Sequence, residues 1–260
     1  MEYSANIEMQ FTEAGPLPER MRAAAEAGFD AVEFWRWEDT DVPALAAAAR
    51  ELDVQIALFA TDWSIAVADP AERARFTASV DGAIRAAGLL GARQIVVSLG
   101  PDLGLPRESL VDELSAALRV VAPRAHDAGV TLLLEPVNTR VDHPGSALSS
   151  TADAREILAR VDHPALRLLF DVYHSAAQGE DVAQELRRSR DLIDYVQLAD
   201  SPGRHEPGTG EIDWMQVATV VREIGYTGRI GLEFSPLADS ATALAQARTV
   251  WEKAWAGSIR

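Results

Sequence analysis

The stretch from Asp127 to Val137 reads DAGVTLLLEPV. Gly129 stands where the end of a helix needs a residue in left-handed backbone conformation, which glycine adopts without steric penalty. Thr131–Val137 follows as a short apolar run, typical of a strand buried on both faces, as strands of parallel sheets are. Glu135 lies near the end of that run. The stretch therefore predicts the end of a helix followed by a strand, a unit called here a helix–strand step, with an acidic side chain near the end of the strand.

The same step recurs along the chain. Residues 24–35 read AAEAGFDAVEFW, residues 90–100 read LGARQIVVSLG and residues 223–234 read EIGYTGRIGLEF. The strands begin roughly every 32 residues, the length of one β–α unit. The pattern predicts eight strands, at Tyr3–Phe11, Ala31–Trp35, Val54–Ala60, Gln94–Gly100, Thr131–Val137, Leu166–Val172, Asp194–Asp200 and Arg229–Phe234.

The segments between these strands are predicted to be helices. Asp69, Pro70 and Glu72 form a helix start, with a capping side chain, a proline in the first turn and an acid after it. Eight strands that alternate with helices predict an α/β fold, a (β/α)₈ TIM barrel, as one domain over residues 1–260. The alternative is an open doubly wound sheet, which is disfavoured because no G-x-G-x-x-G follows any predicted strand.

Composition excludes several classes of function. Forty acidic against twenty-four basic residues give a net charge of −16, which argues against nucleic acid and anionic membranes as partners. The absence of cysteine excludes disulfides, zinc–thiolate sites and cysteine nucleophiles. The first residues, MEYSANIEMQF, lack the features of a secretory signal, and no apolar run approaches the length of a membrane span. A cytoplasmic location is expected.

Polar side chains with oxygen donors mark the ends of four consecutive predicted strands. They are Glu135, Asp171, Gln197 and Glu233. Active sites of β/α barrels are built at the carboxyl ends of the strands, and carboxylate and amide oxygens suit a hard divalent ion such as Mg²⁺ or Mn²⁺. Any one of these acids could instead cap a helix or pair with an arginine. Four in succession favour a shared site.

Loops beyond the strand ends carry further candidates. His174 follows Asp171 by three residues, and Arg204 and His205 lie in the loop SPGRHEPGTGEIDW. Either histidine could face a substrate, because loops after barrel strands carry function, and Trp63 could wall a small pocket. The alternatives are a loop hydrogen bond for His205 and rim packing for Trp63.

Several blocks of the sequence are similar to those of a known family. The segments YSANIEMQFTE, AGFDAVEFW, LLLEPVNTR, LLFDVYH, GRHEPGTGEIDW and GYTGRIGLEFSP resemble the hydroxypyruvate isomerase family of the xylose isomerase-like barrel superfamily, whose relatives include ketose 3-epimerases. The resemblance covers nearly the whole chain. Two loops depart from the family pattern, LFATDWSIAV after the third predicted strand and NTRVDHPGS after the fifth. Both would touch the substrate.

The resemblance implies the roles of individual residues. Glu135, Asp171, Gln197 and Glu233 would bind Mg²⁺ or Mn²⁺, with Co²⁺ as a further choice, and Glu135 and Glu233 would also form the acid/base pair. His174 and Arg204 would contact substrate oxygens. Ketose 3-epimerases usually carry histidine where Gln197 stands, so the chain is closer to the hydroxypyruvate isomerase branch.

The chemistry expected is proton transfer next to a carbonyl group, through an enediolate. The substrate would be a small hydroxy-keto acid, most simply hydroxypyruvate converted to tartronate semialdehyde, with a ketose that undergoes 3-epimerisation as the alternative. Arg140 or Arg204 could hold a substrate carboxylate through a forked pair of hydrogen bonds. The roles of Asp142 and His143, next to Arg140, stay open. A DNA-repair endonuclease is disfavoured by the charge, and an inert barrel by the presence of all four oxygen ligands.

Self-association is also open at this point, since barrels of this size often pair. The helix that contains Trp251 and Trp255 could pack against a second copy of the chain or against its own barrel.

Overall fold

Eight parallel strands form a closed barrel in chain order in the computed structural model, which describes residues 1–258. The ring closes where Tyr3 and Ser4 pair with Ile230 and Gly231. The expected barrel is thus confirmed. The strands are β1 Tyr3–Asn6, β2 Ala31–Arg36, β3 Gln55–Ala60, β4 Gln94–Val96, β5 Thr131–Leu134, β6 Leu166–Asp171, β7 Ile193–Leu198 and β8 Ile230–Leu232.

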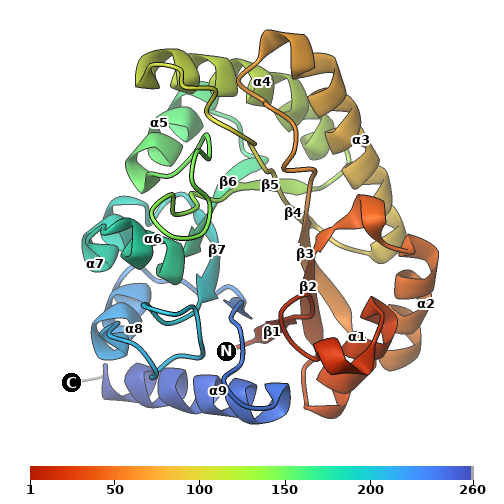
Figure 1. The fold of residues 1–260 in the computed structure, drawn as a ribbon, viewed down its shortest axis with the longest axis vertical. Coiled ribbons are helices and arrows are strands. Elements are labelled where there is room, and N and C mark those ends of the chain that lie inside the picture. The colour runs from red at the N-terminus through yellow and green to blue at the C-terminus, as the bar shows by residue number, and fades with distance from the viewer. Residues whose placement is uncertain (259–260) are drawn as a thin grey trace.

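Helices surround the strands (Figure 1). They are α1 Leu17–Glu26, α2 Val42–Leu52, α3 Arg73–Leu90, α4 Arg107–Asp127, α5 Thr151–Val161, α6 Val172–Gln178, α7 Val182–Arg188, α8 Trp214–Glu223 and α9 Ser240–Gly257. Short 3₁₀ turns lie at Thr12–Ala14, Trp37–Asp39 and Pro70–Glu72.

Short polar side chains start many of these helices. Asp41, Asp181, Asp213 and Asp239 each accept a hydrogen bond from a backbone N–H in the first turn. Such caps satisfy donors that the helix itself leaves unpaired. Gly129 follows α4 with φ of +68°, as the helix–strand step predicts. The local signals read from the sequence therefore act where they were expected.

Several strands end earlier than their apolar runs. The first was expected to reach Phe11 but ends at Asn6, because the Asn6 side chain accepts hydrogen bonds from the backbone N–H groups of Glu8 and Met9 and turns the chain. In β5, regular pairing ends at Leu134, just before Glu135 and Pro136, and proline has no N–H to continue a ladder. The remaining residues of these runs become loops that line the barrel mouth.

The C-terminal helix packs on its own barrel. Trp251 is fully buried, with its ring centroid 6.4 Å from that of Trp214, and Trp255 lies under the guanidinium of Arg222. The packing of Trp251 is therefore explained within one chain. Within residues 1–258, no helix combines the length and apolarity that crossing a bilayer requires.

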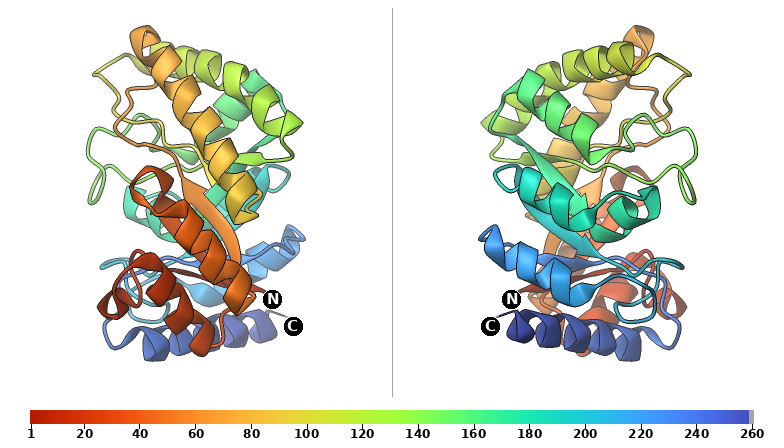
Figure 2. Two further views of the ribbon diagram at one scale, coloured as in Figure 1. Left: turned by 90° about the vertical axis from the view of Figure 1, so that its right-hand side faces the viewer. Right: turned by 90° about the vertical axis from the view of Figure 1, so that its left-hand side faces the viewer.

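All eight strands point the same way, so their carboxyl ends share one mouth. In Figure 2 the connections that follow β4 and β5 extend from the same face of the barrel. The backbone of Ala147 donates to the carbonyl of Gly100, which ties these two connections together. The mouth is therefore walled by long loops on the side of β4 and β5.

Candidate active site

The four oxygen-bearing side chains predicted from the sequence all belong to the mouth of the barrel. Glu135 directly follows β5, Asp171 ends β6, Gln197 is the penultimate residue of β7, and Glu233 directly follows β8. Glu135, Gln197 and Glu233 line one cavity of about 430 Å³. Residues separated by almost a hundred positions in the sequence thus meet because the parallel barrel brings its strand ends together.

Two of these carboxyls, with a histidine, form a tight cluster. One ligating atom from each of Glu135, Asp171 and His174 lies within 4.8 Å of the other two. Burial and the neighbouring charges of Glu233 and Asp171 raise the pKa of Glu135 well above its usual range. Burial is also the main reason that the pKa of Asp171 rises to about 7, although nearby Arg204 opposes the rise. The positive charge of the surrounding protein groups is therefore too small to favour full ionisation of both carboxyls.

Glu233 differs from Glu135 because its carboxylate is held by several donors. Its Oε1 accepts hydrogen bonds from Asn6 Nδ2 and Trp35 Nε1, both at 2.8 Å. Its Oε2 accepts a hydrogen bond from Arg204 at 2.9 Å. Glu135, by contrast, accepts no hydrogen bond from any residue between 1 and 258, so it is the freer of the two carboxyls.

The tautomer of His174 follows from its hydrogen bonds. Its Nδ1 lies 3.2 Å from the backbone N of Asn138 and 2.7 Å from Asn138 Nδ2, and both groups can only donate. Nε2 faces one donor, Arg204 Nη2, at the longer distance of 3.3 Å. The two shorter contacts make Nδ1 the acceptor, which assigns the ring proton to Nε2. Burial and the charge of Arg204 hold the pKa of His174 well below its usual value, so the ring is neutral. Nε2 lies 3.7 Å from Glu135 Oε1. A neutral ring that presents N–H to the cavity is a hydrogen-bond donor rather than a metal ligand.

Two buried oxygens at the mouth lack partners among the described residues. They are Oδ2 of Asp171 and Oε1 of Gln197. An unpaired buried oxygen is costly unless something binds it. Carboxylate and amide oxygens are the donors that hard divalent ions prefer. The residues present therefore fit a divalent cation.

The cavity includes some of the other predicted residues and leaves out two. His174, Arg204 and Trp63 line it. His205 and Arg140 are not among its lining residues. His205 bonds to the carbonyl of Ser235 through Nδ1, and the Arg140 guanidinium lies against Gly179. Their proposed contacts with substrate stay predictions.

The cavity wall is uneven in chemistry. The side formed by β2, β3 and β4 is mostly apolar, whereas the charged groups lie on the side of β5 to β8. The apolar side is lined by Phe34, Trp35, Leu58, Ala60, Trp63, Val96, Val97 and Leu99. Such a wall excludes water from the charged side.

Asp142 and His143, whose roles the sequence left open, lie beside this charged side. Asp142 Oδ2 accepts hydrogen bonds from Asn138 Nδ2 at 2.8 Å and Tyr173 Oη at 2.7 Å. The His143 ring packs on His174, with centroids 5.3 Å apart, and lines the cavity. Both therefore support the loop that holds His174 in place.

The loop that carries Arg204 is organised by a residue that sequence reasoning missed. Asp200 is fully buried, and its carboxylate accepts from four backbone N–H groups and from Trp214 Nε1. Its carbonyl accepts from the N–H of Arg204, which takes a left-handed backbone conformation with φ of +54°. The only signal in the sequence was an acid at the end of an apolar strand, which Asp200 shares with the predicted ligands.

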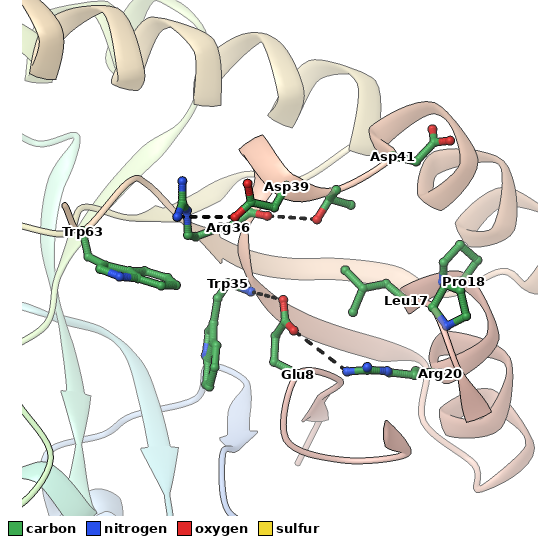
Figure 3. Close-up of a pocket in the computed structure, with 11 residues that line it drawn as sticks. Glu8, Leu17, Pro18, Arg20, Trp35, Arg36, Asp39, Asp41 and Trp63 are labelled. Carbon is green, nitrogen blue, oxygen red and sulfur yellow. Dashed lines mark hydrogen bonds and ion pairs between the residues drawn. The ribbon is translucent and has the colours of Figure 1, made fainter. Parts of the chain in front are cut away.

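A second cavity, of about 420 Å³, shares Trp35 and Trp63 with the first. Figure 3 shows Glu8 between the backbone N of Trp35 and the guanidinium of Arg20, at 3.3 and 3.9 Å. Arg36 lies over the Trp63 ring, 5.2 Å from its centroid. These contacts hold the two tryptophans that separate the cavities.

A parallel β/α barrel whose last four strands gather carboxylate and amide oxygens at one mouth defines a class of barrel enzyme suited to a hard cation. Similarity to known proteins identifies the family of the chain. The family description "Xylose isomerase-like TIM barrel" matches residues 21–254. The chain is 32% identical over 265 residues to a putative hydroxypyruvate isomerase of Danio rerio, covering 96% of each protein. It is 33% identical over 254 residues to a 2-oxo-tetronate isomerase of Cupriavidus necator, covering 93% of this chain and 95% of the relative.

Solved structures agree on the fold. An AP endonuclease, family 2, from Brucella melitensis matches with a TM-score of 0.89 and 29% identity, over 95% of this chain and 98% of that one. An L-ribulose 3-epimerase matches with a TM-score of 0.83 and 23% identity, over 99% and 96%. The chain belongs to the xylose isomerase-like TIM barrel family, within its group of hydroxypyruvate isomerases, and it is an isomerase.

Proposed function

We propose that this isomerase converts hydroxypyruvate, or a closely related 2-oxo acid, to its 2-hydroxy-3-oxo isomer with the help of a divalent metal ion. The observation that carries the proposal is that two carboxyls, Glu135 and Glu233, face one cavity together with the guanidinium of Arg204. Two carboxyls can move a proton between neighbouring carbons, and a guanidinium binds a carboxylate through paired N–H groups.

Four residues of the chain have separate roles in the proposed reaction. Glu135 removes a proton from C3 of hydroxypyruvate, and the electron pair moves into an enediolate. Glu233, which must be protonated at this stage, gives its proton to C2, and the proton of the C3 hydroxyl passes to the oxygen on C2. This leaves an aldehyde at C3 and a hydroxyl at C2, and exchange with solvent removes the proton from Glu135 and restores the one on Glu233. His174 donates its Nε2–H to a substrate oxygen, and Arg204 holds the carboxylate with N–H groups that it does not use on Glu233.

Glu135, Asp171, Gln197 and Glu233 would hold the metal ion, for which Mg²⁺, Mn²⁺ and Co²⁺ are candidates. When bound, such an ion stabilises negative charge that develops on substrate oxygens. The unpaired oxygens of Asp171 and Gln197 support this assignment.

A second candidate is 3-epimerisation of a ketose, favoured by the size of the cavity. About 430 Å³ is more space than a three-carbon acid needs. The same two carboxyls would then act on opposite faces of one carbon. The net charge of −16 argues against abasic DNA as a substrate.

The deciding experiment compares substrates and follows the proton. Purified protein with Mn²⁺ is incubated in deuterated water with hydroxypyruvate, 2-oxo-tetronate, ribulose and tagatose, and the products are identified by NMR. We expect tartronate semialdehyde from hydroxypyruvate, with solvent deuterium at C2. Epimerised ketose with no turnover of either acid would establish the second candidate instead.

Metal binding is expected to stabilise the protein more at high pH than at low pH. The pKa of Asp171 is raised from 3.8 to about 7 in the folded chain, so without metal the folded state loses stability as pH rises through this window. A cation needs the ionised carboxylates and displaces their protons, so its binding tightens as pH rises.

Thermal unfolding measures this effect directly. The increase in Tm on adding Mn²⁺ should be larger at about pH 8 than at about pH 6, since fewer protons compete with the ion. Asp171→Asn, which does not titrate, should reduce the Mn²⁺ effect and flatten its pH dependence. An increase in Tm that is equal at both pH values in the unmodified protein would contradict the prediction.

A further inference from the structure

Beneath the candidate metal site lies a buried acid that the proposed chemistry does not use. Glu33, in β2, is fully buried inside the barrel. Its Oε1 lies 2.6 Å from both Ser4 Oγ and Tyr195 Oη, and its Oε2 accepts from Gln197 Nε2 at 2.6 Å. Ser4 belongs to β1, and Tyr195 and Gln197 belong to β7, so the network crosses the inside of the barrel.

The contact with Glu33 decides which way the Gln197 amide faces. The end of the amide that meets Glu33 is Nε2, which can only donate, and it lies 2.6 Å from Glu33 Oε2. The other end, Oε1, then points away from Glu33. This Oε1 is buried and has no partner among the described residues. Without Glu33 the amide could turn over and present its N–H₂ group, which repels a cation.

The neighbouring strand leaves room for this pair. Gly231 of β8 is paired in register with Gln197. A Cβ atom at position 231 would lie 2.3 Å from Glu33 Oε1 and 2.7 Å from Gln197 Cγ. Glycine is therefore required for the acid and the amide to occupy their present positions. Three strands contribute to the arrangement of one amide group.

We propose that Glu33 is a positioning residue that fixes the amide of Gln197 with its oxygen toward the metal ion. The inference rests on the proposed function, because it takes Gln197 as a ligand. Glu33 itself touches neither metal nor substrate. A buried acid is unfavourable unless its hydrogen bonds are satisfied, and here Ser4, Tyr195 and Gln197 satisfy them. Residues that orient a metal ligand typically change metal affinity by about 10–100-fold when replaced.

Two conservative variants test whether the position of the acceptor oxygen of Glu33 or the charge of its carboxyl group matters for metal binding. Glu33→Asp keeps the charge but withdraws the acceptor from Gln197 by one methylene group. Glu33→Gln loses the charge but keeps an oxygen that can accept from Gln197 Nε2. We expect the affinity for Mn²⁺, measured by isothermal titration calorimetry, to fall by at least about tenfold in Glu33→Asp and to stay close to that of the unmodified protein in Glu33→Gln. A role based on charge predicts the reverse order.

The dependence on Gln197 is tested in a second background. In Gln197→Ala, adding Glu33→Asp should weaken Mn²⁺ binding no further, since the group that Glu33 positions is gone. Ser4→Ala, which removes another partner of Glu33, should lower Tm without changing Mn²⁺ affinity. Tm is measured for every variant, so loss of fold is seen separately from loss of affinity.

The possible failures are distinguishable. If Glu33→Gln weakens Mn²⁺ binding as much as Glu33→Asp, or if the Glu33→Asp effect persists in Gln197→Ala, the positioning role is overturned and the proposed isomerase stands. If neither variant changes Mn²⁺ affinity, Glu33 serves the fold alone. If the unmodified protein binds no Mn²⁺, the metal-dependent function and the role of Glu33 fall together.

Discussion

Replacement of Glu135 by Gln is expected to lower kcat by a factor of roughly 10²–10⁴, the usual contribution of a positioned acid–base group. Glutamine has the shape of glutamate but cannot take a proton from carbon. Burial and neighbouring carboxylates raise the pKa of Glu135, so the carboxyl keeps its proton until a bound cation displaces it. The ionised carboxylate is then a stronger base than an exposed one. The rate is measured with saturating Mn²⁺ and hydroxypyruvate.

Hydrogen exchange distinguishes the role of Glu135 from that of Glu233. In Glu135→Gln, exchange of the substrate C3 hydrogen with deuterated solvent should fall together with turnover. In Glu233→Gln, turnover should fall while exchange continues, because Glu135 still removes the proton. Glu223→Gln, at an exposed pair with Arg187, is the matched control and should behave like the unmodified protein. Full activity with normal exchange in Glu233→Gln would remove that residue from the acid–base pair.

The fold was predictable because each strand carries its own signal. Eight short apolar runs alternate with helical segments, and this alternation predicts a closed barrel. Glycine closes the helix at four of these steps, and an oxygen-bearing side chain marks the end of four runs. The placement of Glu135, Gln197 and Glu233 in one cavity then follows from topology, since parallel strands share their carboxyl ends. No detail of side-chain packing is needed for that step.

Side-chain orientation in loops was not predictable in the same way. Arg140 and His205 lie in the loops that a barrel uses for substrate, yet neither lines the cavity. The loop at Arg140 is shaped by the Asn138 side chain, which accepts from the N–H groups of Val141 and Asp142. Such contacts depend on tertiary structure that a linear pattern does not contain. Glu33 was missed for a different reason, because an acid within the run AVEF reads as ordinary strand sequence although it is the one charged residue there.

Arg204 is expected to stabilise the metal-free site as well as bind substrate. Its guanidinium is largely buried and interacts with Glu233, Asp171, Glu135 and Asp142. Among the residues that line the cavity, it is the only permanently charged cation. Removing one partner of a buried ionic cluster leaves the opposite charge uncompensated, which typically costs about 3–5 kcal/mol. A divalent ion bound at the same carboxylates would supply the missing positive charge.

Arg204→Ala should therefore lower the free energy of unfolding, measured in urea, by about 3–5 kcal/mol without metal and by clearly less with saturating Mn²⁺. Arg187→Ala, at an exposed pair, is the control and should change it by less than about 1 kcal/mol with or without Mn²⁺. Arg204→Lys keeps the charge but loses the planar fork, so it should remain nearly as stable while kcat/KM for hydroxypyruvate falls. A destabilisation that Mn²⁺ does not relieve would show that Arg204 and the ion do not share the same carboxylates. If the lysine variant turned over hydroxypyruvate normally, Arg204 would not be the group that binds the substrate carboxylate.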